Sequence, residues 1–546
     1  MKARPFLLAV ALTLLLLLGS AIGLAWTMAR QSPLRIADRP LALPRAAQFV
    51  PRDAALSLHW LVDPGRLPDY AQAVAPAARR HAVREAMTQL RNGAFALAGL
   101  DFEAELGDWL GSQVSLILLD SGAEDQPPGW VLALASQDRD GARRFLQRFW
   151  QTRSLAGTDL QISRYRGIGV ISGRGALLGR DPQPIATALI DDDLLLLASG
   201  RGVLEQALDS SQLDAVHQLA DPQLQSLVKR LGRGVALLTA NPQALEHWFD
   251  LPASVSQRRD LQGVVAALMP EGSDLRLEGL LRFREPVVVR RRADPESDTL
   301  LHAAAGPAEA LAVLDAPARL LSDAEDPLAQ WLGPVLRAQL DRADSAALRA
   351  VAEFDAGPLL WEQLPVGWLL GTALARPDDA VVDAALRDDG LVRSQLQGEH
   401  GLLNVWTRLQ RQRSHGKESL QTELAVAREV ADGEAWWGDS LESLRQRSDG
   451  KGGRSRTAQL QALTADALVE GGSALQQLAL DERLAREQLQ RWRPWMLLQA
   501  VAGRPLLPTV QGMAMAVTAG DADIQLAPEQ AGVSDTLRLR ARISFG

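Results

Sequence analysis

The residues of this chain with the widest chemical range are its seven histidines, which could ligate a metal or act as general bases. A protein metal site needs several ligands at short, regular spacing. No two histidines here have an HxxxH or HxH spacing, and no acidic partner lies at metal-ligand spacing. We therefore expect surface or capping roles, with no metal and no cofactor. The seven are His59, His81, His217, His247, His302, His400 and His415.

Two other motifs imitate ligand sites. Three consecutive aspartates (191–193) could bind a cation, but an EF-hand loop needs spaced oxygens around a glycine and a distant glutamate. The run lies between Ile190 and Leu194, so we predict a turn at the start of a strand. Gly167 and Gly169 resemble part of a nucleotide loop, yet they do not lead into a helix as the GxGxxG fingerprint requires. Neither motif predicts a bound ligand.

Nucleophilic catalysis has no local signature in this sequence. There is no GxSxG nucleophile elbow, no SxxK paired with KTG, and no cysteine. A triad of serine, histidine and aspartate built from distant residues is defined by geometry alone, so the sequence does not exclude one. We expect no catalytic residues, and a hydrolase with a dispersed active site is kept as an alternative.

A basic segment in the second half of the chain could touch anionic lipid headgroups. Each such charge contributes about 1 kcal/mol near a negative membrane surface. The alternative interpretation is a solvated loop, because the charges stand among glycine and serine. The candidate residues are Arg445, Arg447, Lys451, Arg454 and Arg456.

Tryptophan is abundant, with 14 residues against two tyrosines. Trp436, Trp437, Trp492 and Trp495 could line an apolar ligand site or meet a bilayer interface. The alternative role for them is core packing.

Composition excludes several classes of function. The net charge of −8 gives the chain no electrostatic reason to bind nucleic acid. Hydrophobic residues at 47% and charged residues at 23% are typical of a globular protein. The absence of cysteine excludes disulfides and thiolate metal sites.

The N-terminal segment predicts a membrane anchor. Residues 6–28 carry no charge and are long enough to cross a hydrocarbon core of about 30 Å, so a lipid bilayer is the expected partner. A cleaved signal peptide is the competing interpretation, although its apolar region would be shorter. Lys2 and Arg4 favour an N-in orientation, with the bulk of the chain translocated to a periplasm or lumen.

The remainder of the chain reads as two copies of a unit of about 250 residues. Phe102, Trp109 and Val114 have counterparts in Phe354, Trp361 and Val366, and several further landmarks keep the same order. We predict an anchor (1–30), a linker (31–46), a first half (47–284), a second linker (285–306) and a second half (307–546).

Each half combines strands with capped helices. Apolar runs end at Asp63-Pro64 and Asn241-Pro242, which is typical of a strand that passes into a helix. Alternating stretches such as 275–278 and 537–540 indicate half-exposed strands. The predicted fold class is α+β, with mixed or antiparallel sheets and helices packed on one face. The sequence leaves open whether the halves share one sheet.

Several segments resemble a known family. They are residues 31–34 (QSPL), 46–51 (AAQFVP), 61–67 (LVDPGRL) and 155–160 (LAGTDL). Together with the anchor, they are similar to cyanobacterial membrane-anchored proteins of a domain-of-unknown-function family (number three-three-five-two). The resemblance implies a cyanobacterial source and an envelope or thylakoid-lumen location, and it transfers no catalytic residues.

The favoured function is a membrane-tethered, non-enzymatic binding or scaffold protein, whose partner is a protein or an apolar ligand of unknown identity. The alternative is a carrier or sensor of a lipid or another apolar ligand held between the halves. The dispersed-site hydrolase is the third hypothesis.

Overall fold

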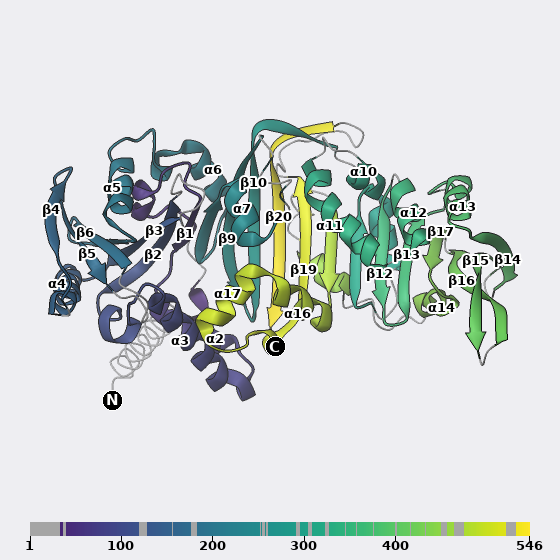
Figure 1. Cartoon of the computed structure of the whole chain (residues 1–546), viewed down its shortest axis with the longest axis horizontal. Helices are drawn as coiled ribbons and strands as arrows, with labels where there is room; N and C mark the ends of the chain where they lie inside the picture. Colours follow the sequence, from purple (N-terminus) through teal and green to yellow (C-terminus); the bar gives the residue numbers. More distant parts are fainter. Residues whose placement is uncertain are drawn as a thin grey trace, which may run out of the picture.

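The structure, shown in Figure 1, is a computed structural model. It describes residues 33–545 apart from 37–39, 120–127, 156, 176–182, 252, 254–256, 258–259, 291–294, 304–307, 323–326, 344, 356, 375, 399–400, 415–416, 432, 449–455, 464–473 and 520–530. The predicted anchor (6–28) lies outside the described residues. Within them, no helix combines the length and apolar character needed to cross a bilayer.

The described strands fall into two groups of ten. The first group is β1 (Leu56–Trp60), β2 (Leu110–Leu119), β3 (Gly129–Ser136), β4 (Gln161–Tyr165), β5 (Ile168–Gly175), β6 (Gln183–Ile190), β7 (Leu194–Ala198), β8 (Ala236–Ala240), β9 (Leu261–Glu271) and β10 (Asp274–Arg290). The second group is β11 (Ala310–Leu314), β12 (Leu359–Leu364), β13 (Gly367–Ala373), β14 (Val392–Gln397), β15 (Leu402–Ser414), β16 (Lys417–Ala431), β17 (Glu434–Gly438), β18 (Ala474–Leu480), β19 (Val510–Ala519) and β20 (Ala531–Phe545).

Helices connect these strands. In the first half they are α2 (Leu67–Val74), α3 (Arg80–Ala96), α4 (Arg139–Leu155), α5 (Arg201–Ser210), α6 (Pro222–Leu231) and α7 (Pro242–Phe249). Short 3-10 turns are η1 (Pro33–Arg35), η2 (Arg45–Phe49), η3 (Pro64–Arg66, directly before α2), η4 (Ala77–Arg79) and η6 (Gln218–Ala220), and η5 (Phe102–Leu106) is a short π-helix. In the second half they are α9 (Pro295–Ala303), α10 (Pro317–Ser322), α11 (Pro327–Ala343), α12 (Ala346–Phe354), α13 (Asp379–Asp388), α14 (Leu441–Ser448), a helical segment over 456–463, α16 (Glu482–Arg491) and α17 (Arg493–Ala502).

Strand pairing follows the same order in both halves. The first half runs β4-β5-β6-β7-β3-β2-β1-β8-β9-β10. The second half runs β14-β15-β16-β17-β13-β12-β11-β18-β19-β20. All of these pairs are antiparallel. The fold is therefore α+β and antiparallel, as the sequence predicts at that level.

The two halves share one continuous sheet, because β10 pairs with β20. Their register runs from Leu275 opposite Ile543 to Arg290 opposite Ala531. The sheet follows the long axis of the molecule, with β4 near one end and β14 near the other (Figure 1). The segment predicted as the second linker (285–306) contains the end of β10 and most of it is regular structure, since α9 follows.

Helices cover both faces of the sheet, so the prediction that they pack on one face is wrong. On β3, Val131 and Ala133 belong to the apolar cluster under α5, whereas Leu132 and Leu134 belong to the cluster under α4. Side chains alternate along a strand, so burying both sets requires cover on both faces. The continuous apolar run of this strand is the signal of two-sided burial.

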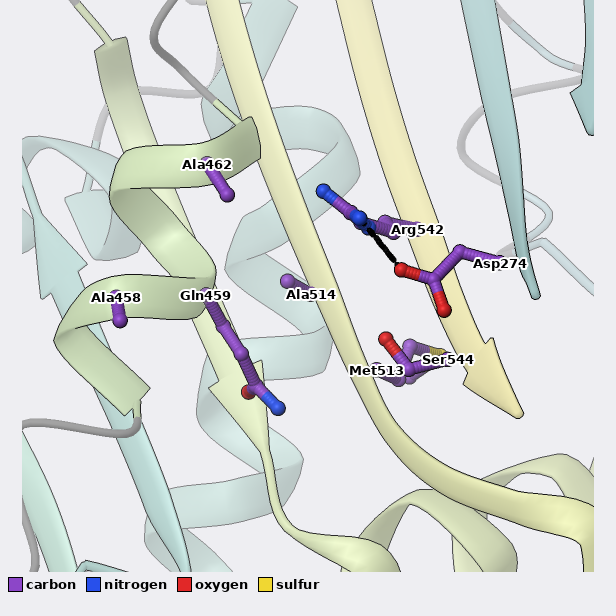
Figure 2. Close-up of a pocket in the computed structure, with 8 residues that line it drawn as sticks. All are labelled: Asp274, Ala458, Gln459, Ala462, Met513, Ala514, Arg542 and Ser544. Carbon is purple, nitrogen blue, oxygen red and sulfur yellow. Dashed lines mark hydrogen bonds and ion pairs between the residues drawn. The ribbon is translucent and has the colours of Figure 1, made fainter. Parts of the chain in front are cut away.

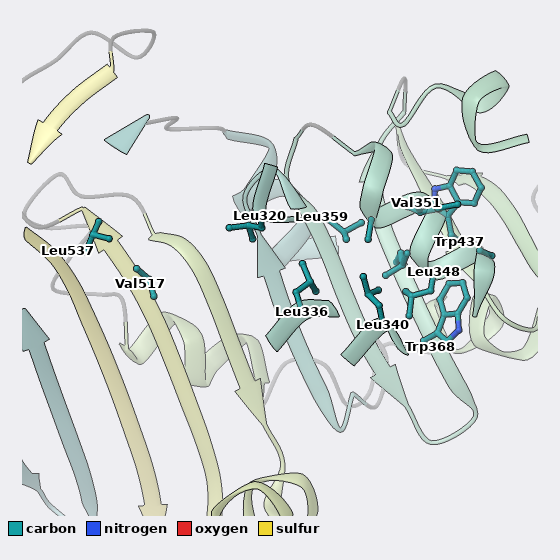
Figure 3. Packing of buried hydrophobic residues seen from close by; sticks show 14 of the residues in the cluster. Leu320, Leu336, Leu340, Leu348, Val351, Leu359, Trp368, Trp437, Val517 and Leu537 are labelled. Atoms are coloured by element: carbon teal, nitrogen blue, oxygen red, sulfur yellow. The ribbon is translucent and has the colours of Figure 1, made fainter. Parts of the chain in front are cut away.

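The largest apolar cluster spans both halves. Leu56 and Leu281 of the first half lie in the same cluster as Leu348, Trp437 and Leu537 of the second. Figure 3 shows Leu537 on a strand at the left of the view, with Leu320, Leu336 and Leu340 to its right. Each fully buried side chain of this kind contributes about 1.5–3 kcal/mol. The halves are thus joined by side-chain packing as well as by the ladder of the sheet.

Local sequence signals explain the helix starts. The Asn241 side chain accepts a hydrogen bond of 2.8 Å from the Ala244 N–H, and Pro242 occupies the first helical position of α7. The Asp63 carboxylate likewise accepts from the Gly65 N–H at 2.8 Å. Both caps confirm the predicted transitions from strand to helix, because each satisfies a backbone donor that the first turn leaves unpaired.

Candidate functional sites

A small hollow lies where the two halves meet (Figure 2). Its volume is about 230 Å³, below the range of about 300–1,000 Å³ that drug-sized ligands occupy. Arg542 of β20 donates to the Asp274 carboxylate of β10 at 2.7 Å, so the charges on its wall neutralise each other. The lining residues are Asp274, Ala458, Gln459, Ala462, Met513, Ala514, Arg542 and Ser544.

Next to this hollow, the seam between β10 and β20 carries a buried ionic cluster. Glu278 lies 3.5 Å from Arg540 and 3.4 Å from Arg538, and Arg276 is 3.8 Å away. Arg540 is 1% exposed and Glu278 is 7% exposed. Buried charges of this kind are tolerated only when they are paired. Sequence reasoning missed this cluster because the alternating charges of each strand looked like a solvent-facing row.

A serine–histidine pair occurs in the interior of the first half. The Nδ1 atom of His59 is 2.8 Å from the Ser115 hydroxyl, on the neighbouring strand. The two residues are 0% and 1% exposed, and burial lowers the pKa of His59 from 6.5 to about 4. Ser57, Thr239 and Gln218 form a hydrogen-bonded group beside them. The pair is shielded from water, and it lines neither the small hollow at Asp274 nor the more open one beside α5.

A buried carboxylate occupies the second half. Glu362 of β12 is 0% exposed, and neither of its side-chain oxygens has a hydrogen-bond partner among the described residues. Burial raises the pKa of Glu362 from 4.5 to about 7, while the positive charge of Arg447 acts in the opposite direction. Its strand neighbours Leu360 and Leu364 belong to an apolar cluster, which explains why the charged form is disfavoured.

The structure separates the residues of the predicted basic segment. Arg445 is exposed and lies 3.9 Å from Glu442. Arg447 is 8% exposed and its guanidinium lies 5.0 Å from the centre of the Trp436 ring. Arg456 donates to the Leu480 carbonyl at 2.9 Å. Lys451 and Arg454 lie outside the described residues. The three described arginines therefore do not share one exposed surface.

The four predicted tryptophans form two separate groups. Trp436 and Trp437 are both 0% exposed and, as neighbours on β17, point into clusters on opposite faces. Trp495 stacks on Phe545 with ring centres 6.3 Å apart. The Trp492 indole donates to the Phe249 carbonyl of α7 at 3.1 Å. None of the four lines the small hollow at Asp274 or the more open one beside α5.

The aspartate and glycine motifs form turns. Residues 191–193 connect β6 to β7, and Asp191 and Asp192 have positive φ angles. Arg45 pairs with Asp191 and Asp193, and Arg143 pairs with Asp192. Among the described residues, no group of three or more candidate ligands could hold a metal ion. Gly167 lies in the turn between β4 and β5, at φ +84°.

A second, more open hollow lies beside α5. It measures about 550 Å³, and its lining combines apolar side chains such as Leu213 and Val216 with the carboxylates of Asp53, Glu205 and Asp209. The Tyr165 hydroxyl donates to Asp209 at 2.7 Å, and the Arg166 guanidinium donates to the same carboxylate at 3.1 Å. These contacts tie β4 and its turn to α5. The Tyr165 hydroxyl and the Asp209 carboxylate, which are the reactive groups of this hollow, therefore already serve as structural links.

Each end of the sheet presents an edge strand. Among the described strands, β14 pairs only with β15, and β4 pairs only with β5. All six residues of β14 are exposed, including Val392 at 65% and Leu396 at 45%. Ile162 of β4 is 79% exposed. Soluble proteins usually protect such edges with charges or covering segments, because unpaired backbone groups bind other strands.

The fold and these sites define a class of protein: a two-part α+β body built on one antiparallel sheet. The chain belongs to the family described as Protein of unknown function (DUF3352), whose model matches residues 10–527. No curated protein matches the sequence. One solved structure, "Structure of crystal form I of TP0453", is 8% identical, and the match covers 44% of this chain and 80% of the other, with a TM-score of 0.25. That likeness is too low to support an argument.

Proposed function

We propose that the protein is a membrane-tethered, non-enzymatic scaffold of a bacterial envelope or thylakoid lumen, held by residues 6–28 in an N-in orientation. One observation carries the scaffold role. The sheet passes from one half to the other through the pairing of β10 with β20, which has one register shift between Arg282 and Val287. Its two ends carry exposed edge strands in equivalent positions, β4 and β14. A rigid body of this kind can hold two partners at a set separation.

The binding mode that fits these edges is strand addition. An extended peptide that pairs with an exposed edge gains main-chain hydrogen bonds, and neighbouring apolar side chains supply specificity. Val392 and Leu396 on β14, and Ile162 on β4, are exposed apolar side chains of the type that such a partner would cover. The partner is therefore a protein that offers an extended segment.

The test is site-specific photo-cross-linking of the full-length chain in its native membrane. A photoreactive residue replaces Leu396 on β14 or Ile162 on β4. Val366, which is 40% exposed in the turn between β12 and β13, is the matched control. We expect a discrete protein adduct from both edges and none from position 366. Equal labelling at all three positions, or none at either edge, would contradict the scaffold role.

We further infer that the halves arose by tandem duplication. The support is the shared order of ten strands in each half. The landmark residues of the sequence do not add to it, because Val114 lies within β2 whereas Val366 lies in the turn after β12. Both halves also place an edge strand at the outer end and a long strand at the seam.

The alternative of an apolar-ligand carrier has one observation in its favour, the hollow between Asp274 and the 456–463 segment. Its volume of about 230 Å³ suits a small molecule better than a lipid. Mass spectrometry of protein purified from its membrane tests this alternative, because a carrier would retain its ligand in a fixed ratio. For the hydrolase alternative, the His59–Ser115 pair supplies a serine–histidine hydrogen bond, but that pair lies in the interior, away from both hollows.

A further inference from the structure

Helix α17 turns an apolar surface toward solvent. Met496, Leu497 and Leu498 are consecutive and are 46%, 48% and 42% exposed. Ala500, one turn further along, is exposed as well. Surface helices normally present polar side chains outward, and runs of three exposed apolar residues usually mark a contact with another partner. The outward side of α17 is therefore unusual for a helix that faces only water.

The inward side of α17 packs tightly against the rest of the molecule, so the exposure of the apolar residues on its outward side does not result from loose packing of the helix. Trp495 is 3% exposed and stacks on Phe545 of β20. On α3, a Cβ atom added at Gly93 would lie 1.9 Å from the Val501 carbonyl oxygen, which shows how closely the two helices approach. The orientation of Met496 and Leu497 is thus set by contacts with both halves of the molecule.

The position of α17 relative to the chain's entry point indicates what covers it. The described chain begins at η1, which packs on α2; α2 packs on α3, and α3 packs on α17. In Figure 1, α2, α3 and α17 lie together at one side of the sheet. Four residues separate the end of the predicted anchor at Met28 from Pro33, a span of at most about 18 Å. A chain anchored there brings this side of the domain close to the bilayer.

We propose that α17 is a second membrane contact, with Met496, Leu497 and Ala500 inserted at the headgroup–acyl boundary of the bilayer that holds the anchor. This inference rests on the proposed tether. Arg493 and Arg504 bracket the apolar stretch, an arrangement typical of helices that lie in the interface plane. The contact would fix the orientation of the sheet on the membrane, and with it the directions in which β4 and β14 face.

The test uses a feature of the sequence: with no native cysteine, a single Leu497→Cys change gives one labelling site. The full-length variant carries a nitroxide label and is reconstituted into vesicles of phosphatidylcholine and phosphatidylglycerol. Electron paramagnetic resonance then measures label collisions with oxygen, which concentrates in lipid, and with a water-soluble nickel chelate. Leu213→Cys is the matched control, at a leucine 62% exposed just after α5.

We expect several-fold fewer nickel collisions and more oxygen collisions at position 497 than at 213. Equal nickel collisions at the two positions would overturn the inference, as would a label at 497 shielded from both reagents, since that indicates a protein contact. Vesicle flotation of the same samples separates the two proposals. A chain that floats while its label at 497 stays in water retains the tether and loses the α17 contact, whereas a chain that does not float loses both.

Discussion

The buried Glu362 predicts a specific dependence of stability on pH. Burial raises the pKa of this carboxyl from 4.5 to about 7. Between those two pH values the folded chain keeps a proton that the unfolded chain has released, so stability falls as the pH rises and levels off above about 7. Each pH unit between the two pKa values lowers the free energy of unfolding by about 1.4 kcal/mol, so Glu362 lowers it by about 3 kcal/mol in total by pH 8.

The perturbation is Glu362→Gln, which keeps the size of the side chain and cannot ionise. The assay is urea unfolding of the full-length protein in detergent, followed by tryptophan fluorescence at pH values from 4.5 to 8. We expect the stability of the variant, relative to the parent, to increase by about 3 kcal/mol across this range. Comparing the two chains at each pH removes any constant cost of burying an amide.

Glu442→Gln is the control, because this residue is an exposed carboxylate on the nearby α14. It tests whether loss of a negative charge anywhere in the region reproduces the effect. A difference between Glu362→Gln and the parent that stays constant from pH 4.5 to 8 would refute the assignment of the raised pKa to this carboxyl.

Three further predictions concern the interior and the helix contacts. Burial lowers the pKa of His59 to about 4, so the parent loses stability as the pH falls from 6.5 toward 4. The variant His59→Asn can still form a hydrogen bond with Ser115, and in the same unfolding assay it loses about 3 kcal/mol less stability over that pH range. Gly93→Ala forces α3 away from α17 and destabilises the fold by about 1–3 kcal/mol. Gly202→Ala in α5, where an added Cβ meets nothing within 4 Å, stabilises the fold by about 0.5–1 kcal/mol. If thermal unfolding gave stability changes of the same sign for both variants, the close approach at Gly93 would be contradicted. Asn241→Ala removes the cap of α7 and lowers stability by about 1 kcal/mol, while Asn241→Asp keeps most of the stability that the cap provides. An equal loss of stability for the two variants in denaturant unfolding would argue against the cap.

Several elements follow from local patterns in the sequence. Asn241 before Pro242 predicts a helix start, and the aspartates at 191–193 predict a turn before Leu194; the structure has both. These signals are readable because caps, turns and alternation depend on residues close together in the chain. The ten strands of each half pair in the same order, but the landmark residues that suggested two similar halves do not align, since Val114 lies within β2 and Val366 in the turn after β12.

Burial of the key charged and polar side chains is a tertiary property. Glu362 and His59 belong to strands whose local sequence does not reveal what covers them, and the helices that cover a strand can come from any part of the chain. The same limit explains why Arg447, predicted to be at a lipid surface, lies against Trp436. The cover on both faces of the sheet had a local signal, the continuous apolar run of β3, which the prediction of helices on one face did not use.

By itself, then, the sequence determined the kinds of element and their boundaries at capped helix starts and turns. Only the tertiary structure decided that the halves share one sheet, because the pairing of β10 with β20 brings together residues more than 200 positions apart, such as Glu278 and Arg540. It also decided that Met496 and Leu497 face outward while Trp495 faces inward, although all three belong to one apolar run. The reason is that non-local packing selects among the faces that a local pattern offers.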